Sequence, residues 1–164
     1  RDAMLAVGGQ LDRAVGGPSE DLASPKNCRR TFYAAISRHD LNPLLRLFDF
    51  PDPNIASAER TVTTVPLQQL FVLNSEFMVR SAKALAAKLT AGPKEDEASR
   101  ICRAFVLLYG RPATTKEVEL GLQYLTNSET SDGVAGHAKG DRSLTQWEKY
   151  AQVLLSANEF LYVD

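Results

Sequence analysis

Residues 60–79, RTVTTVPLQQLFVLNSEFMV, contain the pattern that decides the fold. Pro66 ends a run of β-branched residues, and its fixed φ suits the first turn of a helix. Apolar residues then recur at helical spacing, with two glutamines on the other side: Leu67, Leu70 and Phe71 against Gln68 and Gln69. This spacing predicts a helix that begins at Pro66 and buries its leucines.

Asn74 and Ser75 interrupt this helix. Either side chain can accept a hydrogen bond from the free amides at the start of a second helix, and Glu76 suits the positive end of its dipole. Two helices therefore meet at an angle inside one apolar stretch. We expect this stretch to lie at the centre of the core.

The chain beyond this stretch reads as three more helices. The second helix continues as a stripe of Met78, Ala82, Leu85 and Leu89 and stops at Gly92-Pro93. A helix over about residues 94–109 follows, in which Ala98, Ile101, Phe105 and Leu108 form the buried stripe, widened by Val106 and Tyr109. Gly110-Arg111-Pro112 stops it, and Thr114 with Glu117 fits a capping box that opens the next helix. These signals predict a helical hairpin with a short turn.

A last helix is expected from about residue 143, and the segment after it should dock on the core. Its predicted inward side chains are Leu144, Trp147, Ala151, Leu154 and Leu155, and those of the terminal segment are Phe160, Leu161 and Tyr162. The polar, Gly-rich residues 127–142 separate this helix from the hairpin. Two short segments of the chain are similar in sequence, LFVLNSEFMV at 70–79 and LLSANEFLYV at 154–163. We interpret both as segments in which one helix ends and the next begins.

The first sixty residues carry weaker signals. Residues 1–15 place Met4, Val7, Leu11 and Val15 on one face of a helix that Gly8 and Gly9 weaken, and residues 18–27 are loop by composition. Residues 28–38 alternate as a short half-buried strand does, and residues 61–65 are its candidate partner in a two-stranded ribbon. Asp40 or Asn42 can cap a short helix that starts at Pro43, and Phe48 and Phe50 are expected to pin the following loop to the core.

The composition is that of an ordinary water-exposed globular domain. The chain has 164 residues, of which 44% are hydrophobic and 24% charged, and 19 basic against 20 acidic residues leave a net charge of −1. This balance provides no overall field for nucleic acid or an anionic membrane, and no apolar run approaches the ~20 residues that span a bilayer. The chain starts with Arg, as if inside a helix. We predict one mainly α, compact multi-helix domain over residues 1–164, the C-terminal fragment of a longer protein.

The two cysteines, Cys28 and Cys102, are too few for a disulfide framework or a zinc site. No CxxCH motif is present to attach a haem, so no cofactor is expected in this fragment. Cys102 has apolar neighbours and is expected to be a small buried hydrophobe. A bond between the two cysteines stays open from the sequence.

No motif for nucleophilic, metal-dependent or phosphate chemistry is present, so the catalytic residues are unknown. His39 is either a general base or, as we favour, a surface or capping residue, and His137 falls in the polar segment. Asp49, Asp52 and Asn54 could offer oxygens to a calcium ion, but their number and spacing favour hydrogen bonds that cap turns.

Four arginines flank the predicted ribbon, namely Arg29, Arg30, Arg38 and Arg60, and clustered arginines can bind carboxylates, phosphates or sulfates. Arg30 and Arg60 could bind a ligand anion together with Asp49 and Asp52 at a shared site, or could form an internal network that locks the loop. The internal network is the favoured interpretation. Arg30, Asp49, Asp52 and Arg60 are therefore the candidate ligand or loop-locking cluster, and no metal is assigned to it.

Several long segments resemble one known family in order along the chain. They are RRTFY, LLRLFDFPDPN at 44–54, RTVTTVPLQQLFVLNSEF at 60–77, AFVLLYGRPATTKE at 104–117 and the terminal LLSANEFLYVD. They resemble the planctomycete domain of unknown function found near the C-terminus of large proteins that often carry a cytochrome-c-like module upstream. The resemblance implies an exported or periplasmic parent protein with haem elsewhere, and it assigns no catalytic residue.

Two functional interpretations follow. In the first, the chain is a non-catalytic helical module that docks on the upstream domains of its own polypeptide, and an exposed apolar patch would support this. In the second, it contributes to the active or ligand site of an enzyme that acts on complex carbohydrate or a redox partner. A pocket joining Arg30, Asp49, Asp52 and Arg60 would favour that alternative.

Overall fold

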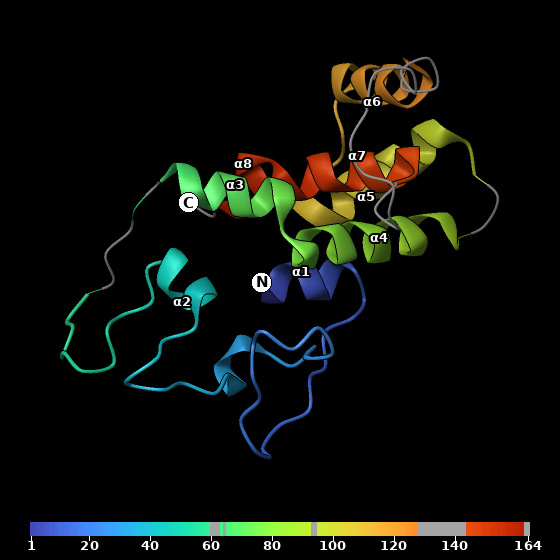
Figure 1. Ribbon diagram of the computed structural model, residues 1–164. Coiled ribbons are helices and arrows are strands. Elements are labelled where there is room, and N and C mark those ends of the chain that lie inside the picture. Colours follow the sequence, from blue (N-terminus) through green and yellow to red (C-terminus); the bar gives the residue numbers. More distant parts are fainter. Residues whose placement is uncertain (60–62, 64, 93–94, 128–143, 163–164) are drawn as a thin grey trace.

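The computed structural model describes residues 1–59, 63, 65–92, 95–127 and 144–162. This part of the chain is mainly helical, which confirms the predicted fold class (Figure 1). The elements are α1 (Asp2–Val7), the 3₁₀ helix η1 (Thr31–Tyr33), α2 (Pro43–Leu47), α3 (Pro66–Asn74), α4 (Glu76–Thr90), α5 (Glu97–Tyr109), α6 (Thr115–Asn127), α7 (Gln146–Ser156) and α8 (Asn158–Leu161).

The core forms where α4 packs along α7, with α1, α3 and α5 against α4. The predicted stripe of α4 is confirmed, because Met78, Ala82, Leu85 and Leu89 are all buried. The inward residues of α7 are Tyr150, Ala151, Leu154 and Leu155. Apolar side chains spaced by three and four residues on both helices therefore make one continuous interface.

The helical hairpin of α5 and α6 is also confirmed. Gly110 caps α5 in the left-handed conformation, at φ 69°, which glycine adopts without steric cost. At the start of α6, the backbone amide of Thr114 donates to Glu117 Oε2 at 2.7 Å, and the Glu117 amide donates to Thr114 Oγ1 at 3.4 Å. This is the reciprocal pairing of a capping box.

Arg111, in the turn of this hairpin, binds two carboxylates. Its guanidinium donates to Glu117 Oε1 at 2.8 Å and Oε2 at 3.0 Å, and to Glu159 Oε1 at 2.6 Å. Glu159 belongs to α8, so Arg111 ties the hairpin turn to the last helix of the chain. The hydrogen bonds from Arg111 and from the Thr114 amide lower the pKa of Glu117 from 4.5 to about 2.

We expect the stability of the domain to fall in acid because of this network. The pKa of Glu117 is lower in the folded chain than in the unfolded one, so its contribution is full above about pH 4.5 and is lost as pH falls towards 2. Urea titrations at pH 6, 4, 3 and 2 should show a smaller decline for Glu117→Gln than for the wild-type chain. Glu119→Gln, on the same helix, is the control and should keep the wild-type slope; equal slopes for all three chains would contradict the prediction.

Two short breaks between helices share one geometry. Ser75 separates α3 from α4 with φ −70° and ψ 144°, and Ala157 separates α7 from α8 with φ −67° and ψ 142°. A single extended residue thus ends one helix and opens the next in both places. The predicted helix-end role of the two similar segments is confirmed, and Ser75 caps α4 by accepting from the Met78 amide at 3.2 Å.

The N-terminal third departs from the expected helix over residues 1–15. Helix α1 ends at Val7, because Gly9 takes φ 71° and the amides of Gln10 and Leu11 both turn back to the carbonyl of Leu5. Val15 is consequently exposed rather than part of a helical face. Two glycines in sequence end the helix here instead of only weakening it.

The strand predicted over residues 28–38 is wrong. Residues Thr31–Tyr33 form η1, and single β-bridges on either side pair Arg29 with Asp12 and Ala34 with Glu20. Asp12 and Glu20 in the N-terminal loop are the bridge partners of this segment. The expected pairing with residues 61–65 falls largely outside the described residues, because only 63 and 65 are described. The alternating residues thus form isolated bridges and not a strand. They belong to residues 8–59, a loop-rich segment that we call the N-terminal lobe.

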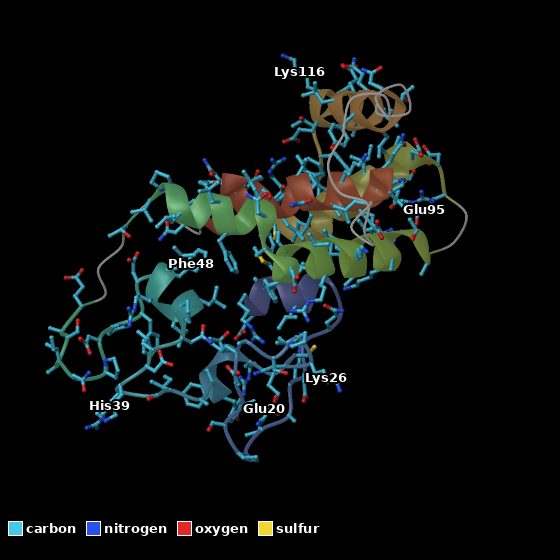
Figure 2. The ribbon with its side chains drawn as sticks, in the orientation of Figure 1. Glu20, Lys26, His39, Phe48, Glu95 and Lys116 are labelled. Atoms are coloured by element: carbon cyan, nitrogen blue, oxygen red, sulfur yellow. The ribbon has the colours of Figure 1, made fainter. Side chains whose placement is uncertain are left out.

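This lobe has a small apolar cluster of its own, made by Leu22, Ala34 and Leu45 with Leu41 and Phe50 against them. Helix α2 begins as predicted, with Asn42 Oδ1 accepting from the Leu44 amide at 2.9 Å. Figure 2 shows Phe48 beside α2. Its ring meets that of Phe71 edge-on with centroids 5.6 Å apart, and this contact joins the lobe to the helical body, that is α1 and α3 to α8. Phe48 and Phe50 thus pin the loop as expected.

Some side chains face differently from the prediction. Gln68 and Val72 are the buried residues of α3, whereas Leu67, Leu70 and Leu73 are more than half exposed. Helix α3 therefore lies at the edge of the core, and its leucines point outward. Three further residues are less buried than expected: Val106 and Tyr162 are exposed, and Cys102 is half-buried.

The two cysteines, Cys28 and Cys102, are free thiols.

Candidate functional site

Asp49 links the loop after α2 to the segment that enters α3. Its carboxylate accepts from the Thr63 amide at 2.8 Å and from the Thr63 hydroxyl at 2.8 Å. Its backbone has φ 57°, a left-handed conformation that Asp adopts more readily than most residues. Asp49 therefore holds the loop after α2 against the segment before α3 by hydrogen bonds to a residue 14 positions later.

Asp52 caps a turn, which is the role that the sequence analysis favoured over calcium binding. Its Oδ1 accepts from the Asn54 backbone amide at 2.9 Å and from Asn54 Nδ2 at 3.1 Å. The Asn54 amide group also donates to the Arg38 carbonyl at 3.1 Å, which ties this turn to the preceding loop. Within the described residues, no group of three or more His, Cys, Asp or Glu side chains is placed to hold a metal ion.

The two arginines of the candidate cluster have different positions. Arg30 is exposed beside η1, with its guanidinium 5.7 Å from the centre of the Tyr33 ring. Arg60 lies outside the described residues, so the predicted lock of Arg30, Asp49, Asp52 and Arg60 stays a prediction. The hydrogen bond from the Gly16 amide, with smaller contributions from Arg30 and Arg29, lowers the pKa of the Tyr33 hydroxyl.

Two buried polar residues were not singled out for these roles by the sequence. Arg29 donates to the carbonyls of Pro18 and Gly16 and stacks on the Tyr33 ring at 4.2 Å. Gln68 donates from Nε2 to the Leu47 carbonyl at 3.0 Å and accepts from the Val65 amide at 3.3 Å, which joins the end of α2 to the start of α3. Neither contact has a local sequence signal, because the partners of both lie in other segments.

The exposed leucines of α3 make an apolar stripe on the surface. Leu67, Leu70 and Leu73 are spaced by three residues and are 63%, 53% and 54% exposed. At the Leu67 end, the stripe meets a hollow of about 420 Å³ that Asp40, Arg46, Asp49 and Thr63 also line. An apolar centre with polar side chains at its margin is the usual arrangement of a protein–protein interface.

A larger apolar groove separates the N-terminal lobe from the helical body. It has a volume of about 530 Å³, and five phenylalanines line it: Phe32, Phe48, Phe50, Phe71 and Phe77. Two other hollows near the lobe have more polar linings, and one of them contains Asp52 and His39. Asp49 and Asp52 thus line different hollows.

The comparisons with known proteins give one match. A family model described as "PSD1: Protein of unknown function (DUF1553)" matches residues 1–125. The chain belongs to the PSD1 family. The match covers the N-terminal lobe and α1 to α5 and most of α6 of this PSD1 chain, so it includes both the leucine stripe and the acidic loop. Searches of curated proteins and of solved structures found no match.

The family match confirms the expected membership of a family of unknown function. Among the described helices of this PSD1 chain, none has the length and apolar character needed to cross a bilayer. Asp49 lies in the connection between α2 and α3, and Gln68 lies in the first turn of α3. What these residues do chemically is to hold that connection, through Asp49 with Thr63 and Gln68 with Leu47.

Proposed function

We propose that this domain is a non-catalytic module that docks, through the leucine stripe of α3, on the upstream domains of its own polypeptide. The observation that carries the proposal is the exposure of Leu67, Leu70 and Leu73 on one face of a well-formed helix. Leaving three large aliphatic side chains in water forgoes a stabilisation of about 25 cal/mol for each Å² that a partner would cover. A partner that covers the stripe would recover it.

The family resemblance supports a finer version of this proposal. The parent protein would be a planctomycete protein, exported or periplasmic, with its haem in an upstream cytochrome-c-like module and none in this chain. The net charge of −1 gives no reason to invoke nucleic acid as a partner. The domain would then complete the folded body of the parent rather than carry out a reaction of its own.

A second candidate function is a share in the active or ligand site of an enzyme that acts on complex carbohydrate or a redox partner. The observation that favours it is the hollow next to α2, in which Asp49 lies together with Asp40 and Arg46. It is the weaker candidate, because Asp49 and Asp52 line separate hollows. Asp49 also already holds Thr63 through two hydrogen bonds.

Docking is tested by isothermal titration of this chain against the separately expressed remainder of its parent protein. We expect saturable binding with a negative heat-capacity change, the mark of buried apolar surface. Leu70→Lys should weaken binding at least about tenfold, because it places a charge in the apolar centre of the interface. Leu120→Lys is the control, since Leu120 is also an exposed leucine but lies on α6, and it should bind like the wild-type chain.

Absence of binding by the wild-type chain would overturn the proposal. Equal weakening by Leu70→Lys and Leu120→Lys would also count against it, because the effect would then not be specific to α3. Both substituted positions are exposed, so circular dichroism should show unchanged helix content in both variants.

A further inference from the structure

Three basic side chains line one hollow beside α2. Arg38 and His39 come from the loop before this helix and Arg46 from the helix itself, and the hollow has a volume of about 310 Å³. All three residues are exposed, and Figure 2 shows His39 at the outer edge of the N-terminal loops. Leu41 and Phe50 also line the hollow and add apolar surface.

Hydrogen bonds between its own segments hold the walls of this hollow together. Asn54 donates from Nδ2 to the Arg38 carbonyl at 3.1 Å and to Asp52 Oδ1 at 3.1 Å, so the loop that carries Arg38 is fixed to the turn at Asp52. Helix α2, which carries Arg46, is capped by Asn42. Arg38 and Arg46 therefore project from anchored backbone and keep their own side chains exposed.

The charges in this hollow are not neutralised within it. The ion pairs of the described residues involve Arg1, Arg103 and Arg111, and neither Arg38 nor Arg46 forms one in that part of the chain. Asp52 is the acidic residue of the hollow, and its Oδ1 already accepts from two groups of Asn54. Arg46 also borders the adjoining hollow, where Asp40 and Asp49 lie. Within the present hollow, two guanidinium groups against one engaged carboxylate leave an excess of positive charge and of N–H donors.

We propose that this hollow binds an oxyanion group, that is a carboxylate, sulfate or phosphate carried by a ligand. The planar fork of a guanidinium matches two oxygens of such a group, and hydrogen bonds between two charged partners are about twice as strong as neutral ones. The His39 ring can add one more N–H donor, and Phe50 offers an apolar surface to the rest of the ligand. This binding is separate from docking through α3 and does not depend on it.

The test is a nuclear magnetic resonance titration of the whole chain with sodium phosphate, sodium sulfate and sodium acetate. Ionic strength is held constant with sodium chloride, and the arginine Nε–Hε and backbone signals are followed. We expect saturable shifts at Arg38, Arg46 and residues 52–54 with at least one of the three anions. The anion that binds most tightly identifies the group that the ligand carries.

Three variants sharpen the test. Arg38→Gln with Arg46→Gln should weaken binding by about tenfold or more, because it removes both charge-assisted contacts. Asp52→Asn keeps an oxygen to accept from Asn54 but removes the negative charge, so it should tighten binding. Arg13→Gln removes an exposed arginine from another loop and should change nothing.

Shifts that rise linearly without saturation, or that chloride reproduces, would mean screening only and would overturn the proposal. Equal affinity of the wild-type chain and the double Arg38→Gln, Arg46→Gln variant would overturn it as well. Because the wild-type titration maps the shifts on the native chain, the conclusion does not depend on the folding of any variant.

Discussion

Replacing Gly121 with valine should destabilise the domain by about 3 kcal/mol, since overpacking a filled core costs 1–3 kcal/mol and occasionally more. A Cβ atom at position 121 would lie 2.6 Å from Tyr150 Oη and 2.9 Å from Ile101 Cδ1. Ile101 is fully buried in α5 and Tyr150 is 5% exposed in α7, so neither side chain can move aside without opening the core. Gly121 thus lets α6 approach both helices closely.

Chemical denaturation of Gly121→Val and of the control Leu120→Val measures this effect. Leu120 is exposed on the same helix, so its replacement introduces only the small cost of a β-branched residue in a helix, about 0.5 kcal/mol. The melting temperature should fall by about 2–4 °C for each kcal/mol lost by Gly121→Val. A loss in Gly121→Val no larger than that in Leu120→Val would contradict the crowding, because valine is a better helix former than glycine and propensity alone would favour Gly121→Val.

A double-mutant cycle tests the crowding directly. Burial raises the pKa of Tyr150 to about 12, in keeping with an enclosed hydroxyl. Tyr150→Phe removes the atom nearest to the added Cβ, so Gly121→Ala should cost less in the Tyr150→Phe background than in the wild-type chain. A coupling energy near zero would contradict the close approach of α6 to α7, because neighbouring residues that crowd each other do not act additively.

The sequence predicts best those features whose cause lies within a few residues. The caps at Asn42, Ser75 and Thr114, the stop at Gly110 and the turn at Asp52 all depend on contacts over two to four positions. Thr114, Gly110 and Asp52 were predicted as such, whereas Asn42 and Ser75 were each one of two candidates. The buried stripe of α4 was also predictable, because α4 has one apolar face. Local hydrogen bonding and a clear periodicity therefore account for most of the helical body.

Helix α3 shows why the rest could not be predicted. Its sequence PLQQLFVLN is apolar on more than one side, so periodicity alone does not choose the buried face. The buried face is the one that carries Gln68 and Val72. The side-chain amide of Gln68 forms hydrogen bonds with the Leu47 carbonyl and the Val65 amide, and Val72 packs in the core. Polar burial of this kind depends on partners in another segment, which the sequence does not identify.

The candidate cluster shows the same limit. The contact of Asp52 with Asn54 is local, whereas that of Asp49 with Thr63 joins positions separated by a whole loop. Arg29 and Arg30 are adjacent and chemically identical, and yet Arg29 is buried and Arg30 exposed. No local pattern distinguishes them, because burial of Arg29 depends on the course of residues 16–18 in front of it.

Arg29→Met should destabilise the N-terminal lobe by about 2–4 kcal/mol, because hydrogen bonds to a charged group contribute about 1.5–3 kcal/mol. The Arg29 side chain donates to the Pro18 carbonyl at 2.8 Å and to the Gly16 carbonyl. Its guanidinium lies 4.2 Å from the centre of the Tyr33 ring, and that stacking adds attraction between the cation and the ring face. Methionine keeps the apolar stem but loses all three contacts.

Amide hydrogen exchange locates the loss. Two single bridges, between Asp12 and Arg29 and between Glu20 and Ala34, pair the loops of the lobe, and the Arg29 side chain adds hydrogen bonds to the carbonyls of Pro18 and Gly16. In Arg29→Met the amides of residues 12–35 should therefore exchange faster, while those of α4 and α7 stay protected. Arg30→Met is the matched control, because Arg30 is exposed and lies farther from Tyr33, at 5.7 Å. If Arg30→Met loosened the lobe as much as Arg29→Met does, the organising role would belong to the charge of the pair and not to the buried contacts of Arg29.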